Sequence, residues 1–290
     1  MGVTAVQSVD WASARRASYL VSQTFRYEYP EPASNLKHRL VVIPPERFGD
    51  QRRLRHRLTV GLEDVRVVDR ADRFGNRVYE VFAPRVPSAI EFTVEITIER
   101  HAAEPNRLPA GWIAPYLLET SKLTAPDARL SMAAEKLAAS GATGLDLADQ
   151  INDWVYQSMT YRAGVTGVRT TAAEALELGV GVCQDYSHVM LAICRACGLP
   201  SRYVSGHLIG QGGTHAWVEV VLPTDDGTGD AIAWAFDPTH AGRGGLGYVT
   251  IAVGRDYSDV APTSGTYLSR GAGNLISHRS VTLTELELEP

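Results

Sequence analysis

Features that mark other classes of protein are scarce in this chain of 290 residues. It has three cysteines, too few for the disulfide framework of a small secreted domain. No apolar run approaches the roughly 20 residues that a membrane helix needs. No apolar run near the N-terminus is long enough for a signal peptide. We therefore expect a cytoplasmic protein with reduced thiols and no membrane partner.

Net charge is also small. The value of −5 argues against a nucleic-acid partner. The charge is uneven, because residues 1–107 hold 17 of the 28 Lys and Arg against 14 acids, and the remainder holds 11 against 19. Together with the length, this asymmetry indicates two domains. The basic cluster RRLRHR at 52–57 fits a solvated strand face better than a nucleic-acid patch.

The first 107 residues are predicted to form a β-sandwich-like domain. EFTVEITIER at 91–100 alternates apolar and polar residues, as a half-buried antiparallel strand does. LRHRLTV at 54–60 alternates too, and with its preceding residue it would place Arg53, Arg55 and Arg57 on a polar face. DRFGNRVYEVFAP has a Gly-Asn turn before another alternating run, which predicts a hairpin. Proline-containing breaks between such strands are typical of a sandwich.

Residues 108–290 are predicted to form a second, α+β domain, entered through a Pro-rich connector at about 105–126. A helix is expected at 147–159 from its apolar face. A short helix should begin at Thr171, which forms a T-x-x-E capping box with Glu174, and end at Gly179. A third helix is expected from about Cys183 to Cys197, and strands follow from residue 201.

The segment GVCQDYSH at 181–188 places Cys183 where a Gly-rich stretch turns into that third, apolar helix. In the first turn of a helix, unpaired backbone N–H groups and the helix dipole favour a thiolate, which is the nucleophilic form of cysteine. The same N–H groups could stabilise an oxyanion on an attacked carbonyl. Cys183 is therefore a candidate nucleophile.

A nucleophilic cysteine needs a base, and the base needs a group that orients it. THAWVEV supplies His215, and WAFDPTH supplies Asp237 at the end of a predicted strand. Neighbouring strands can hold an imidazole and a carboxylate in contact, with the start of a helix packed across them. A Cys183-His215-Asp237 triad is therefore stereochemically reasonable.

In order and spacing, GVGVCQDYSH, CGLPSRYVSGHL, THAWVEV and FDPTH resemble the core of the transglutaminase-like superfamily of papain-fold cysteine enzymes. The β-rich front half resembles the N-terminal domain of two-domain bacterial members. The resemblance covers about residues 17–280. It implies a helix bearing Cys183 packed on an antiparallel sheet, with His215 as the base and Asp237 as its orienting carboxylate.

The resemblance also implies attack on an amide carbonyl of a peptide or protein and a thioester acyl-enzyme. Water would resolve this intermediate in a protease or amidase, and an amine would resolve it in a transglutaminase. We expect hydrolysis, because nothing in the sequence marks a second site for an amine. No cofactor and no metal are expected, since DDGTGD at 225–230 lacks the ligand order of a calcium loop.

Other candidate residues surround the triad. Gln184 could contact substrate or support the oxyanion, mainly through its backbone N–H. Asp185, near the helix start, could pair with His188 three positions later, so both are candidates for a supporting role. Beyond the Cys183 amide no oxyanion donor stands out; Tyr161, Gln184 and Trp217 are candidates of similar merit.

Two hypotheses from other classes remain open. A non-catalytic binding module that kept the fold would predict a broken triad, whereas this one is intact on residue types. A redox or zinc protein would use Cys194 and Cys197, the C-x-x-C pair, with Cys183. That pair closes an apolar helix, where core packing is the better interpretation, and metal analysis would separate the two hypotheses.

Overall fold

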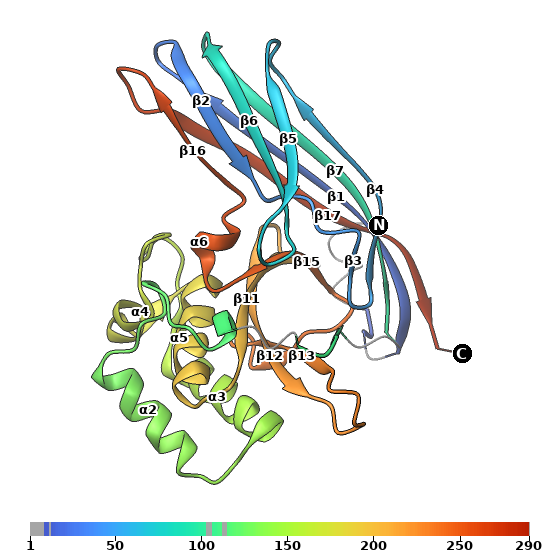
Figure 1. Cartoon of the computed structure of the whole chain (residues 1–290), viewed down its shortest axis with the longest axis vertical. Helices are drawn as coiled ribbons and strands as arrows, with labels where there is room; N and C mark the ends of the chain where they lie inside the picture. The colour runs from blue at the N-terminus through green and yellow to red at the C-terminus, as the bar shows by residue number, and fades with distance from the viewer. Residues whose placement is uncertain (1–8, 12, 103–105, 112–114, 290) are drawn as a thin grey trace.

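Two packed antiparallel sheets form a β-unit that rises above the helices in Figure 1. The computed structural model describes residues 9–11, 13–102, 106–111 and 115–289. The five-stranded sheet runs β17 (Asn274–Leu288), β1 (Ala14–Glu28), β7 (Ala89–His101), β4 (Gln51–Val60) and β3 (Arg47–Phe48). The four-stranded sheet runs β16 (Thr263–Leu268), β2 (Ala33–Leu40), β6 (Arg77–Val86) and β5 (Arg66–Ala71). The predicted β-sandwich-like domain is thus present.

Alternation along the strands builds the core of the β-unit. Every second residue of β7 is buried, and the buried set is Ile90, Phe92, Val94, Ile96 and Ile98. β4 departs from the predicted alternation, because a β-bulge lies between Arg53 and Arg55. The bulge leaves Arg53 half-buried and Leu54 exposed. The prediction that Arg53 shares a polar face with Arg55 and Arg57 was therefore wrong.

The last two strands of the chain return to the β-unit. β17 pairs with β1 along its length, and β16 pairs with β2. The boundary predicted from the sequence, between residues 107 and 108, places these two strands in the second domain. Their backbone partners, β1 and β2, both belong to the first. Their long-range pairing covers edges of β1 and β2 that would otherwise be open to another chain.

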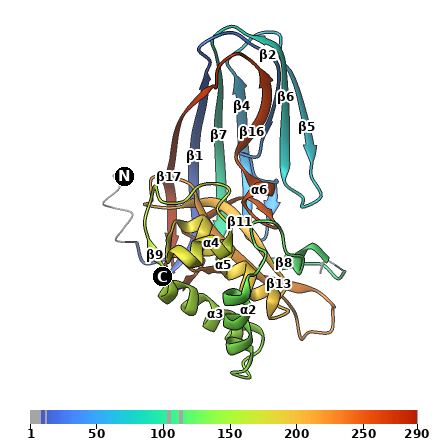
Figure 2. The same cartoon turned by 90° about the vertical axis from the view of Figure 1, so that its left-hand side faces the viewer.

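The remainder of the chain is a mixed unit in which helices cover a six-stranded sheet (Figure 2). The sheet runs β14 (Gly242–Arg243), β13 (Ala231–Asp237), β12 (His215–Pro223), β11 (Ser201–Leu208) and β15 (Tyr248–Gly254), with β8 (Arg107–Leu108) on β13. The main helices are α2 (Ala128–Ala138), α3 (Gly144–Ser158), α4 (Ala172–Leu178) and α5 (Cys183–Ala196). Short elements complete it: η1 (Pro115–Leu117), β9 (Thr160–Tyr161), β10 (Val180–Gly181) and α6 (Tyr257–Val260).

The central helix α5 explains why its sequence is so apolar. It packs against β11 and β12 on one side and against α2, α3 and α4 on others, so residues 184–195 are all buried. The neighbouring α4 is bounded as predicted. The Thr171–Glu174 capping box is formed in both directions, and Gly179 ends the helix with a φ of 63°.

Side-chain amides join the two units at the sheet's outer strand, β15. Gln51 donates to the Thr250 carbonyl at 2.8 Å and accepts from the Thr250 N–H at 2.9 Å. Asn76 does the same at Val253, at 2.7 and 2.8 Å. Both amides are buried, so they replace the backbone partners that an edge strand lacks. The β-unit therefore fixes β15 against the sheet that carries the candidate site.

Two sequence expectations concern parts of the chain only partly described. The connector at 105–126 and the N-terminal segment include residues outside the described ranges. Within the described connector, β8 adds to β13, and η1 follows it. Among the described residues, no helix combines the length and apolar character needed to cross a membrane.

Candidate active site

Cys183 is the first residue of α5 and is half-buried. The turn before it is tight, because a Cβ on Gly181 would lie 2.7 Å from the Cβ of Asp185. The Asp185 carboxylate folds back and accepts the Val182 N–H at 2.8 Å, which fixes the helix start. β10, just before the cysteine, pairs in parallel with β9 and brings Tyr161 beside Gly181.

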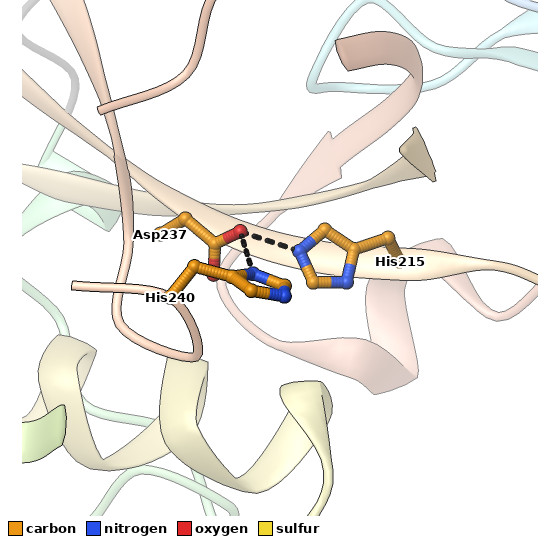
Figure 3. A group of neighbouring side chains, drawn as sticks. All are labelled: His215, Asp237 and His240. Atoms are coloured by element: carbon orange, nitrogen blue, oxygen red, sulfur yellow. Dashed lines mark hydrogen bonds and ion pairs between the residues drawn. The ribbon is translucent and has the colours of Figure 1, made fainter. Parts of the chain in front are cut away.

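His215 and Asp237 lie at facing ends of adjacent strands. Nε2 of His215 is 2.7 Å from Oδ2 of Asp237. Figure 3 draws this contact as a dashed line. Both side chains are almost completely buried. The second ring nitrogen of His215, Nδ1, is thereby left for another partner, and a hydrogen bond with the Cys183 side chain contributes to the pKa of His215. The structure thus pairs His215 with Asp237 and places Cys183 close enough to affect the pKa of His215.

The Asp237 carboxylate has more partners than a triad requires. His240 Nδ1 lies 2.8 Å from the same Oδ2, and the Tyr248 hydroxyl donates to it at 2.8 Å (Figure 3 shows the two histidines). The Thr239 N–H donates to Oδ1 at 2.9 Å. Burial opposes ionisation, but the hydrogen bonds and charges of His215 and His240 outweigh it and hold the pKa of Asp237 well below its usual range. Asp237 is therefore a fixed anion.

That anion determines the protonation state of His215. Burial alone would lower the pKa of the imidazole, because it disfavours the charged form. Hydrogen bonds and charge interactions with Asp237 and Cys183 outweigh burial and raise the pKa of His215 to about 9. At neutral pH the site consequently favours an imidazolium beside the cysteine sulfur.

A cleft of about 660 Å³ adjoins these residues. Its lining comes from α3, β9, α5 and the loops after β11 and β13: Tyr156, Met159, Thr160, Tyr161, Tyr186, Gln211, Thr239 and His240. Burial raises the pKa of Tyr161, and the charge of the nearby Cys183 raises it further. The described lining of the cleft is therefore rich in aromatic rings and holds no Asp, Glu, Lys or Arg, and His240 joins it to Asp237.

The other sequence candidates have different surroundings from those expected. Asp185 and His188 do not pair. Asp185 accepts from Thr166 Oγ1 at 2.6 Å as well as from Val182, and burial raises its pKa. His188 Nε2 instead accepts the Tyr257 N–H at 3.2 Å. Asp185 turns toward the start of the helix because the exposed backbone N–H there needs an acceptor.

Gln184 and Trp217 contact residues near the site, whereas Cys194 and Cys197 do not. The Gln184 side chain donates to the Gly167 carbonyl at 3.3 Å, which ties the loop before α4 to the helix start. Trp217 is buried, and its ring stacks on His215 with centroids 6.2 Å apart. Cys194 is completely buried and Cys197 donates to the Ala134 carbonyl, so these two thiols pack away from the site.

Sequence reasoning missed His240 and Tyr248. His240 stood in the FDPTH block, three residues after Asp237, but that spacing alone does not show that both histidines meet one carboxylate. Tyr248 comes from β15, and no local pattern links it to Asp237. Arg100 of β7 donates to the Tyr248 carbonyl, so the β-unit also helps to hold this tyrosine.

Within the described residues, one group could supply metal ligands: His215, Asp237 and His240, whose ligand atoms lie within 4.8 Å of one another. Both histidine nitrogens that point at Asp237 sit at hydrogen-bond distance from it. At these distances each of the two nitrogens can donate a hydrogen bond to the carboxylate. The donor set is better explained as a hydrogen-bonded cluster than as a metal centre.

Comparisons with known proteins agree with this architecture. The model of the transglutaminase-like superfamily matches residues 131–235, which include Cys183 and His215. The model of the bacterial transglutaminase-like N-terminal region matches residues 19–99. The crystal structure of a "putative cysteine protease" from Cytophaga hutchinsonii superposes with a TM-score of 0.76, over 96% of this chain and 94% of that one. At 21% identity, this likeness concerns the fold.

Curated relatives occur in mycobacteria. An uncharacterized protein of Mycobacterium leprae is 39% identical over 42% of this chain and 44% of its own length. An uncharacterized protein of Mycobacterium tuberculosis is 30% identical over 60% of this chain and 58% of its own length. The chain thus spans about half the length of the curated relatives it matches. On the two family models, this chain belongs to the transglutaminase-like superfamily and carries the bacterial N-terminal region in front of the core.

Proposed function

We propose that this protein hydrolyses amide bonds of peptides or proteins, with Cys183 as nucleophile, His215 as general acid and base, and Asp237 as the group that orients His215. The observation that supports it most is the buried His215–Asp237 pair at 2.7 Å, linked to the half-buried thiol at the start of α5. Membership of a superfamily of cysteine-dependent enzymes adds to this support.

In the first half of the reaction, the thiol proton is on Nδ1 of His215 and the Cys183 sulfur attacks the amide carbon. The carbonyl π electrons move to its oxygen, and the first-turn N–H groups of α5 are the donors proposed to stabilise that oxyanion. The oxyanion then collapses, the C–N bond breaks, and His215 gives its proton to the leaving amine. A thioester on Cys183 remains.

In the second half, His215 takes a proton from water as the water oxygen attacks the thioester carbon. Collapse of the second oxyanion breaks the C–S bond and releases a carboxylic acid. The thiolate and imidazolium are thereby restored. Asp237 keeps its charge throughout and stabilises the imidazolium whenever it forms.

Hydrolysis is favoured over transfer to an amine by the chemistry of the cleft. Among the described residues that line it, none carries a carboxylate that would bind a cationic amine. The hydroxyls of its tyrosines and threonines are compatible with an ordered water. A cytoplasmic location stays a prediction.

Product analysis tests this preference. A peptide substrate found by library screening is incubated in H2(18)O with and without a primary amine. The masses of the products are then measured by mass spectrometry. We expect one heavy oxygen in the new carboxylic acid and little amide adduct, because water has open access to the thioester and the amine has no anionic subsite. Dominance of the amide adduct would reverse the preference in favour of transglutamination, and Cys183→Ala provides the blank for both products.

A further inference from the structure

A second cavity, of about 240 Å³, lies behind the loop that leads into His215. We call residues 209–214, which join β11 to β12, the 209–214 loop. The cavity is lined by that loop, by one residue of β11 and by part of β17: His207, Gly210, Gln211, Gly212, Gly213, Arg279, Ser280, Val281, Thr282 and Leu283. It is therefore built jointly by the mixed unit and the β-unit.

Arg279 is the cation of this cavity. No salt bridge involves it among the described residues, and its Nε is buried without a hydrogen-bond partner. Its guanidinium stacks over the Phe25 ring at 5.0 Å, and the ionisable groups near it are Tyr257, Tyr27 and His207. A partly buried guanidinium without a carboxylate is costly for the fold, so its charge is available to a ligand.

His207 supplies an acceptor beside that cation. It is 1% exposed, and Nδ1 lies 3.1 Å from the Gly213 carbonyl, which can only accept. Nδ1 therefore carries the proton. Burial lowers the pKa of His207 to about 4, so the ring is neutral and Nε2 offers a lone pair. Nε2 has no hydrogen-bond partner in the described structure.

The cavity is connected to the catalytic cleft through one residue. Gln211 lines both, and its Nε2 lies 2.8 Å from Nε2 of His240, which contacts Asp237. Glycines on either side of Gln211 have no Cβ and allow a chain to pass close to the backbone. Gln211 is thus the residue at which this cavity and the cleft beside His240 meet.

We propose that this cavity binds the C-terminal end of a peptide substrate, with the terminal carboxylate on Arg279 and the last amide N–H on Nε2 of His207. An anion without a donor, such as sulfate, would meet the lone pair of His207 instead. The inference rests on the proposed function. It implies that the enzyme cleaves peptides close to their C-terminus and that the β-unit contributes to specificity.

Binding of small probes to the full chain carrying Cys183→Ala tests the inference without any turnover. The probes are N-acetyl-glycylglycine, its C-terminal amide, and the depsipeptide with an ester oxygen in place of the last N–H. Affinity is measured by titration calorimetry, and backbone NMR shifts of the 209–214 loop report the location. We expect the free acid to bind about tenfold or more tighter than either analogue, the ratio for one hydrogen bond to a charged or buried partner.

Variants of Arg279 identify the group responsible. Arg279→Gln should abolish the preference for the acid, and Arg279→Lys should keep part of it. His278→Gln, at the exposed neighbouring position of β17, should leave it unchanged. Urea unfolding of each variant shows whether the fold survives. Equal affinities for the acid and the amide, including no binding of either, would overturn the proposal. If the protein prefers the free acid but the wild type hydrolyses no peptide, only the proposed function is contradicted.

Discussion

Replacing Cys183 with alanine is expected to lower kcat/KM for amide hydrolysis by roughly 10⁴- to 10⁶-fold. The methyl group cannot attack the carbonyl, so no thioester forms, and only binding and oxyanion stabilisation remain. The fold should survive, because Cys183 is half-buried at the end of a helix and not in its core. The measurement is turnover of one peptide by both proteins, with circular dichroism as the test of folding.

Cys197→Ala is the matched control for that substitution. Cys197 is also half-buried, but it lies at the other end of α5 and donates to the Ala134 carbonyl. This variant should keep wild-type turnover. If Cys183→Ala were as active as Cys197→Ala, cysteine catalysis by this site would be contradicted.

Asp237→Asn is expected to lower kcat/KM by about 10³- to 10⁴-fold, as loss of the orienting carboxylate does in serine proteases. Its buried carboxylate accepts from His215, His240 and Tyr248 on one oxygen. An amide cannot serve all three donors and provides no charge for the imidazolium. Asp225→Asn, in the exposed hairpin loop, is the control and should be silent.

The pH profile of the Asp237 variant separates a catalytic from a structural effect. In the wild type the pKa of His215 is raised to about 9, so the imidazolium is present at neutral pH and is lost as pH rises through 9. Activity should therefore fall above about pH 9, because the protonated ring is needed for the leaving amine. The raised pKa of folded His215 also stabilises the fold at pH values below about 6.5, which is the pKa of a histidine in the unfolded chain. This contribution to the free energy of unfolding is lost as the pH rises to about 9.

Without the Asp237 charge, the fall in activity should begin at lower pH, toward the ordinary histidine range. This is measured as kcat/KM against pH for both proteins. If the variant lost activity but its kcat/KM still began to fall at the same pH as in the wild type, Asp237 would have a merely structural role.

Short motifs made much of this site predictable. The capping box at Thr171 and the alternation at 91–100 follow from local rules, and both are found in the structure. The order of the motifs predicts that Cys183, His215 and Asp237 lie close together, and the structure pairs His215 with Asp237. Gly181 also fits, since the turn before the helix leaves no room for a Cβ.

The features that the sequence did not predict depend on pairing between distant parts of the chain. β17 is largely exposed and lacks a strong alternating signal, so nothing local shows that it returns to β1. Arg279 reaches the 209–214 loop only through that return. Likewise, Asp185 and His188 share a helix face, but each found a nearer backbone partner.

The central claim is that His215 activates Cys183, and alkylation tests it without a substrate. Native protein and His215→Ala are treated with iodoacetamide from about pH 5 to 9, and Cys183, Cys194 and Cys197 are followed separately by peptide mass spectrometry. We predict that Cys183 alone reacts rapidly well below the roughly 8.5 at which an ordinary thiol titrates, and that it loses this advantage without His215. Equal reactivity of Cys183 in the two proteins across this range would contradict the claim.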